Sequence, residues 1–192
     1  VNASSEQGLL AVNGMSYQAR DGENANSALI VTVTPKDFPE EGALGGIAFQ
    51  RDLEKKAWEL GKGKVPVQLF GDFCAHQPSS QLGEIHPNIK GGYVLTDVRS
   101  ILPKELGDSI EEGIFAFGKK LSGFDRKDAV LSGIESRTSS PVRLVRDQKG
   151  LSNITGIYPC GEGAGYAGGI TSAAMDGIKT AEWIASEYMM KL

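Results

Sequence analysis

The feature that most constrains this chain is a glycine-rich stretch, residues 156–169, that runs directly into a helical pattern. Within it, Gly163, Gly165 and Gly168 satisfy the spacing G-x-G-x-x-G, which lets backbone N–H groups and a helix N-terminus approach a phosphate or another electron-rich group. The apolar residues that follow share the spacing of one buried helix face: Ile170, Ala173, Ala174, Ile178, Ala181, Ile184, Ala185 and Tyr188. The sequence therefore predicts a strand, a tight turn and a closing helix.

This stretch is not a complete dinucleotide-binding fingerprint. Only 24 residues follow Gly168, which leaves no room for the second strand and the ribose-binding acid that complete such a unit. We therefore interpret residues 156–188 as the last strand and helix of a nucleotide-binding domain whose main binding half lies in another part of a longer protein. A glycine-rich loop that serves only close packing between strand and helix stays an open alternative.

Several motifs resemble those of a known family. The pair Gly161-Glu162, followed by Gly168-Gly169, is similar to the closing motif of glutathione-reductase-like two-dinucleotide-binding flavoproteins. The chain as a whole resembles the C-terminal portion of bacterial FAD-dependent dehydrogenases. This likeness is carried by residues 13–16, 24–28, 49–51, 137–143 and 161–170, in that order along the chain.

The resemblance implies an α/β fold in which an FAD-binding Rossmann-like domain is split along the sequence. Residues 1–27 would be one part of that domain, residues 28–127 an inserted α+β domain, and residues 128–192 the C-terminal part with the terminal strand and helix. The N-terminal βαβ unit would be missing from this chain. That missing N-terminal half of the FAD-binding domain is the partner that the resemblance implies.

The resemblance also implies which residues hold the cofactor. In related flavoproteins the acid after the strand accepts a hydrogen bond from the ribitol, a role that maps to Glu162. The N–H groups near Gly168, Gly169 and Ile170 would face the pyrophosphate or the pyrimidine edge of the flavin, where the positive end of a helix favours electron density. Gly161 and Gly163 complete the predicted cofactor-binding turn.

Arg137 has two open interpretations. It follows a strand-like run and precedes hydroxyl-bearing residues in a turn closed by Pro141, so its guanidinium could bind an anionic substrate or a cofactor phosphate. An ion pair with Asp147 or Glu135 on a neighbouring strand is an equally good interpretation of the same arginine.

The activity implied by the resemblance is that of a flavoprotein oxidoreductase. FAD would move a hydride or electrons between a small-molecule substrate and a nicotinamide, NAD(P), or another acceptor, with no side chain identified as a catalytic acid or base. The 192-residue chain by itself is expected to be inactive and to bind FAD weakly. A non-catalytic interaction or scaffolding module and an FAD-dependent tRNA-modifying flavoprotein are the alternatives.

Charge and cysteine usage argue against nucleic-acid-binding, membrane-spanning and metal-binding proteins. The formal net charge is −4 with no basic stripe, which argues against nucleic acid as a partner and against the tRNA-modifying alternative. No membrane-spanning run is present, and two distant cysteines indicate a reducing, cytoplasmic compartment. Cys74, His76 and His86 are too few ligands for a closed metal site, so we predict none. Cys160 is expected to be a small buried residue.

Periodicity and turn residues predict the remaining elements. We expect two helices with an apolar stripe, a short helix before Pro103 capped by Asp97 or Thr96, and five short strands rich in β-branched residues. The two helices with a stripe are residues 47–60 and 110–121, and the strands are residues 8–13, 28–34, 65–70, 129–134 and 142–145. A long polar loop is expected over residues 71–92.

Overall fold

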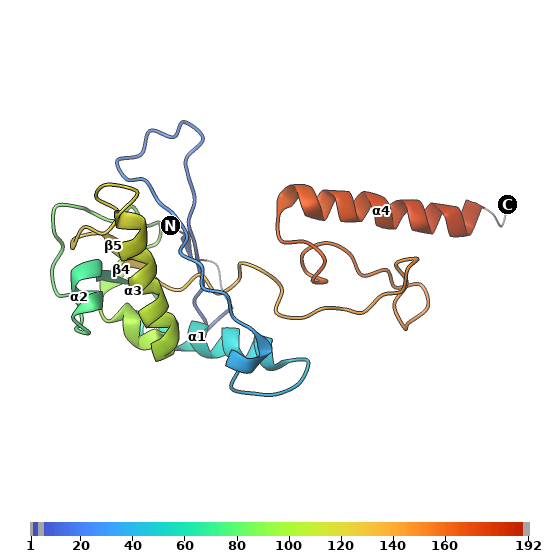
Figure 1. Cartoon of the computed structure of the whole chain (residues 1–192), viewed down its shortest axis with the longest axis horizontal. Helices are drawn as coiled ribbons and strands as arrows, with labels where there is room; N and C mark the ends of the chain where they lie inside the picture. The colour runs from blue at the N-terminus through green and yellow to red at the C-terminus, as the bar shows by residue number, and fades with distance from the viewer. Residues whose placement is uncertain (1, 4–5, 190–192) are drawn as a thin grey trace. The chain divides into compact units, whose positions relative to one another are not determined.

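The computed structural model of the chain describes residues 2–3 and 6–189. It contains two compact units, drawn in Figure 1. Unit 1 comprises Val1–Asp37 and Phe49–Ser136, and unit 2 comprises Phe38–Ala48 and Arg137–Leu192. The three-part division into residues 1–27, 28–127 and 128–192 stays a prediction about the longer protein.

Unit 1 is built around a small three-stranded mixed sheet. Strand β3 (Val65–Leu69) lies in the middle, with β4 (Tyr93–Leu95) parallel on one side and β5 (Val130–Ser132) antiparallel on the other. Because β3 is paired along both edges and its residues 65–68 are all buried, it is covered on both faces, as central strands are. The predicted strand 65–70 and the coarse α/β class are confirmed.

Three helices belong wholly or in part to unit 1. Helix α1 (Gly45–Gly61) confirms the predicted helix 47–60, and a short α2 (Phe70–Cys74) follows β3 directly, inside the segment expected to be a loop. Helix α3 (Lys104–Gly118) begins earlier than predicted because Pro103, which lacks an N–H and has its φ fixed, suits the position just before a first turn. The core of the unit includes Phe49, Leu53, Ala57, Val65, Val67, Phe70, Phe73, Ile101 and Ile114.

A buried polar network fixes the loop between α2 and β4 on this core. Gln68, fully buried, donates to the carbonyl oxygen of Gln77 at 2.8 Å and accepts from the backbone N–H of Arg99 at 2.9 Å. Ser79 donates to Asp72 at 2.6 Å and accepts from the backbone N–H of Leu69 at 2.8 Å. Because every such group is satisfied, the predicted polar loop is an anchored part of unit 1.

The N-terminal region forms less sheet than the sequence predicts. Strand β1 (Asn2–Ala3) pairs with β2 (Val12–Asn13) in a separate antiparallel ladder, which covers only the end of the predicted strand 8–13. The predicted strand 28–34 is wrong: it pairs with no described strand, and Ile30 is 70% exposed. A strand needs a neighbour for its N–H and C=O groups, and periodicity alone cannot supply one. Short 3-10 helices occupy Pro35–Asp37 and Val98–Ile101.

Unit 2 contains one long helix, α4 (Ile170–Met189), which confirms the predicted closing helix. The prediction that its apolar face is buried is wrong, however. Six of its eight members are exposed along the helix: Ile170, Ala174, Ile178, Ala181, Ala185 and Tyr188. The side that packs within unit 2 instead presents Asp176, Thr180 and Trp183.

No strand forms in the described part of unit 2. The predicted strand 142–145 and the predicted strand before Gly161 are therefore both absent, and Val145 is 79% exposed. Cys160 is exposed, so the expectation that it is buried is also wrong. Both segments lack a neighbouring strand within their own unit, and an extended apolar segment without one stays open to water.

The packing of Trp183 on Gly150 gives a first testable prediction. Gly150 has φ +79°, and a Cβ added there would lie 2.4 Å from a ring carbon of Trp183. We expect Gly150→Ala to lower the free energy of unfolding by about 3 kcal/mol, since left-handed strain of about 1 kcal/mol adds to displacement of the indole. Urea unfolding followed by tryptophan fluorescence measures the loss.

The matched control for this prediction is Gly156→Ala. Gly156 has φ +85°, but nothing lies within 4 Å of an added Cβ, so only the backbone strain of about 1 kcal/mol remains. Equal losses in the two variants would contradict the packing of the indole against Gly150.

Candidate functional site

The glycine-rich turn is a compact structure immediately before α4. Gly161 and Gly165 both adopt left-handed conformations, with φ of +72° and +81°. The N–H of Gly165 donates to Glu162 O at 2.9 Å, and the N–H of Tyr166 donates to Gly161 O at 3.0 Å. A Cβ at Gly165 would lie 2.5 Å from the carbonyl oxygen of Val142, so both φ and space require glycine there.

An ion pair joins this turn to α4. Arg146, whose side chain is 9% exposed, donates to the two carboxylate oxygens of Asp176 at 2.6 and 2.9 Å and to Pro159 O at 2.8 Å. Asp176 also accepts from the backbone N–H of Gly161 at 2.9 Å. One carboxylate on the second turn of the helix therefore holds both the arginine and the start of the glycine-rich turn.

The electrostatics of the pair follow from these contacts. Hydrogen bonds from Arg146 and from the Gly161 N–H lower the pKa of Asp176 to about 2. The hydrogen bond to Asp176 in turn raises the pKa of Arg146. Both groups are charged at neutral pH, and the guanidinium carbon lies 3.6 Å from the ring centroid of Tyr166, a favourable cation–π distance.

Tyr166 connects the turn with the segment before it. Its hydroxyl donates to Leu144 O at 3.0 Å and accepts from the backbone N–H of Arg146 at 3.2 Å. Arg143 lies over the same ring at 4.7 Å and donates twice to the carbonyl oxygen of Gly165. The turn is thus fixed by side chains of residues 143–146 rather than by a sheet.

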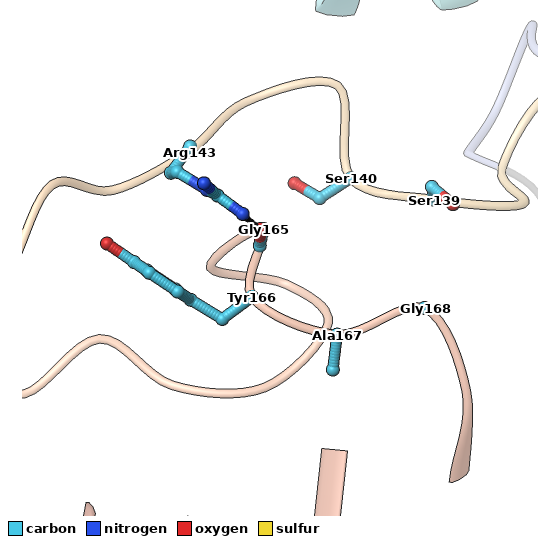
Figure 2. A pocket seen from close by; sticks show the side chains of 7 residues that line it. All are labelled: Ser139, Ser140, Arg143, Gly165, Tyr166, Ala167 and Gly168. Atoms are coloured by element: carbon cyan, nitrogen blue, oxygen red, sulfur yellow. Dashed lines mark hydrogen bonds between the residues drawn. The ribbon is translucent and has the colours of Figure 1, made fainter. Parts of the chain in front are cut away.

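A pocket of about 300 Å³ lies between residues 139–143 and the glycine-rich turn (Figure 2). It opens to solvent and carries one charged side chain, that of Arg143. The residues that line it are Ser139, Ser140, Arg143, Gly165, Tyr166, Ala167 and Gly168.

The structure brings together only some of the predicted site residues. Gly168 lines the pocket, whereas Gly161 and Gly163 shape the turn behind it. Gly169 precedes α4 with its N–H bound to Ser172 Oγ at 3.1 Å, and Ile170, the first residue of the helix, is 93% exposed. The carboxylate of Glu162 is exposed and is not engaged by another residue of the described ranges.

Arg137 lies outside the residues that line the pocket, and its proposed anion contact stays a prediction. Sequence reasoning missed Ser139, Ser140, Arg143 and Tyr166. The signal for Arg143 was present, because it ends the same hydroxyl-rich motif that begins with Arg137.

Other kinds of site find less support. Within residues 2–3 and 6–189, no three His, Cys, Asp or Glu side chains gather in a way that could hold a metal. The pKa of the Cys74 thiol is raised, first by burial and then by the nearby Glu111, which makes it a poor nucleophile. The helices in these ranges are also too short or too polar to cross a membrane.

Comparison with known proteins shows the family to which the chain belongs. A curated protein of Clostridium beijerinckii, described as an uncharacterized protein, is 52% identical over 191 residues, which is 98% of this chain and 36% of that protein. The chain thus spans about a third of the length of the curated relative it matches. The family model described as FAD-dependent protein, C-terminal domain-like matches residues 1–138. The chain therefore belongs to this FAD-dependent protein, C-terminal domain-like family.

Proposed function

We propose that this chain is the C-terminal part of an FAD-dependent oxidoreductase and that its glycine-rich turn holds one side of the flavin nucleotide. The observation that carries this proposal is the set of unengaged polar groups at the exposed start of α4. The N–H groups of Gly168 and Ile170 have no acceptor among the described residues, and the exposed Glu162 carboxylate, in the turn that precedes them, has no partner in the same ranges.

These groups fit the hydrogen-bonding edges of a flavin nucleotide. Glu162 would accept from a ribitol hydroxyl, and the N–H groups of Gly168 and Ile170 would donate to the pyrophosphate or to the pyrimidine edge. Gly169 is a weaker candidate than the sequence suggested, because its N–H already donates to Ser172. Bound FAD would supply transfer of a hydride or electrons between an organic substrate and a nicotinamide or other acceptor.

The turn before α4 would be fixed by groups of this chain. The Asp176 carboxylate holds the N–H of Gly161, and Arg143 holds the carbonyl oxygen of Gly165, so the two ends of the turn have separate anchors. Preorganised N–H groups stabilise developing negative charge without a reorganisation cost. This chain would therefore contribute orientation and electrostatics, while the redox chemistry belongs to the cofactor.

The rest of the cofactor site would come from the N-terminal part of the same protein. The exposed stripe of α4, defined by Ile170, Ala174, Ile178, Ala181 and Ala185, is apolar and rich in small residues that allow a neighbouring element to approach closely. This chain matches only 36% of the length of its relative, so the relative has enough additional sequence to cover such a stripe. We propose that the covering element belongs to a Rossmann-like FAD-binding domain completed by α4.

This proposal predicts different flavin binding by the longer protein and by the 192-residue chain. We expect the full-length protein, expressed with riboflavin supplied, to keep visible flavin absorbance through gel filtration. The 192-residue chain should bind added FAD more weakly than about 1 µM in a fluorescence titration, because it lacks the half that holds the adenosine.

Two outcomes would overturn the proposal. A full-length protein without flavin absorbance would favour a non-catalytic scaffolding module. Submicromolar FAD binding by the 192-residue chain would show that the site is not split.

A further inference from the structure

The pocket beside the glycine-rich turn has a positive charge that no acid balances. Arg143 is its one charged lining residue, and within the described ranges it forms no ion pair with a carboxylate. Arg146, close by in sequence, differs in this respect, because it is paired with Asp176. An arginine without a carboxylate in the wall of a pocket is available to a ligand.

Arg143 is also held in place. Its Nε and one Nη donate to the carbonyl oxygen of Gly165 at 3.0 and 2.9 Å, and its guanidinium lies over the Tyr166 ring. Both bonds go to one acceptor, so the other guanidinium N–H groups have no acceptor in the described protein. A guanidinium oriented in this way loses little entropy when it binds a carboxylate or a phosphate group.

Hydroxyl and amide groups add further donors. Ser139 makes no hydrogen bond with another residue in the described ranges, and its Oγ lies 3.8 Å from the position of a Cβ added at Gly168. The N–H groups of Ala167 and Gly168 likewise have no acceptor among residues 2–3 and 6–189. Ser140 is different, because its hydroxyl donates to the carbonyl oxygens of Val142 and Gly163 and shapes the wall of the pocket. Figure 2 shows Arg143 and Ser139 on the same segment, either side of Ser140.

We propose that this pocket is an oxyanion subsite that binds a carboxylate or phosphate group through Arg143, Ser139 and the N–H group of Ala167. It deepens the proposed function, since it adjoins the turn assigned to the flavin, but anion binding itself does not require FAD. The oxyanion has two possible sources: a phosphate of the cofactor or the acidic group of a separate substrate. With a volume of about 300 Å³, the pocket can hold more than one such group, as small-ligand sites do.

The test is a titration of the ¹⁵N-labelled 192-residue chain with inorganic phosphate and, separately, acetate at constant ionic strength. We expect saturable shifts of the Ala167 and Gly168 amide signals. Arg143→Gln should weaken binding by about tenfold or more, since it removes a charged donor. Ser139→Ala should weaken it by about threefold while leaving the bond between Arg143 and Gly165 intact.

Arg126→Gln is the matched control, because Arg126 is an arginine of unit 1 that is already paired with Asp128 and Glu84. It should leave the anion affinity unchanged. The absence of saturable shifts, or an affinity in folded Arg143→Gln equal to that of the wild type, would overturn the inference. If Arg143→Gln does not fold, an unchanged affinity in Ser139→Ala overturns it instead.

The full-length protein distinguishes the two sources. If the oxyanion is a cofactor phosphate, Arg143→Gln should lose flavin and phosphate should no longer shift the Gly168 signal of the flavin-loaded wild type. If it belongs to a substrate, the variant should keep its flavin and phosphate should still bind the loaded protein. If the full-length wild type contains no flavin, the proposed function is wrong. The phosphate titration of the 192-residue chain then tests the oxyanion subsite independently.

Discussion

Replacing Gly168 by leucine is expected to abolish flavin retention in the full-length protein while leaving its fold intact. Gly168 does not have a left-handed φ, and an added Cβ would make only an ordinary contact with Ser139 Oγ at 3.8 Å. The fold therefore tolerates a side chain at this position. The remaining carbons of leucine would extend over the exposed N–H groups that we assign to the cofactor, so the bound flavin per protein should fall by about tenfold or more.

Absorbance after gel filtration measures the bound flavin, and circular dichroism reports whether the variant is folded. Gly113→Leu on α3 is the control, because Gly113 has nothing within 4 Å of an added Cβ, so it too tolerates a side chain, and it lies in unit 1. It should retain flavin. Wild-type flavin content in folded Gly168→Leu would show that the start of α4 does not face the cofactor.

Removing the Asp176 carboxylate is expected to cost about 2 to 3 kcal/mol of stability in unit 2. Breaking a buried ion pair costs about 3 kcal/mol or more because the remaining charge is left without a partner, and the better helix propensity of alanine offsets about 0.5 kcal/mol of this. The 9% and 12% exposure of the Arg146 and Asp176 side chains places the loss at the low end. Amide hydrogen exchange of unit 2 in Asp176→Ala measures it, and the Gly161 N–H should exchange much faster.

The pH dependence of this loss has a definite sign. The pKa of Asp176 is lowered from 3.8 to about 2, so its stabilising contribution is fully present above about pH 4 and is lost as the pH falls from there toward 2. The stability difference between the wild type and Asp176→Ala should therefore be constant near neutral pH and shrink in that acidic range.

Glu6→Ala is the control for the ion pair. It breaks the contact between Glu6 and Arg51, whose side chains are 60% and 54% exposed, and should change stability by less than about 0.5 kcal/mol. A loss in Asp176→Ala no larger than that of this control would contradict the anchoring role of Asp176.

Elements with strong local signals could be predicted from the sequence. Helices α1 and α4 and strand β3 lie where the periodicity and the flanking glycines indicated, because helix and central-strand patterns depend on neighbouring residues. Segments 28–34 and 142–145 have equally β-rich compositions but form no strand. Whether such a segment becomes a strand depends on a partner strand, which local composition does not encode.

Only part of the candidate site could be predicted from the sequence. The tight turn follows from glycine spacing, which acts over a few residues, and the structure shows positive φ within it at Gly161 and Gly165. The sequence points to Arg137 whereas Arg143 lines the pocket, because spacing alone cannot tell which of two arginines in one motif meets a turn more than twenty residues later. Its bonds to Gly165 O exist only once the two segments are brought together.

By itself, the sequence determined that a glycine-rich turn leads into a closing helix. Only the tertiary structure decided which side of that helix packs within unit 2. Asp176 and Trp183 lie on that side, one bonded to Arg146 and the other packed on Gly150, and the helix is thereby rotated so that its apolar stripe is exposed. Helical spacing specifies which residues share a face, but contacts between distant residues decide what covers it.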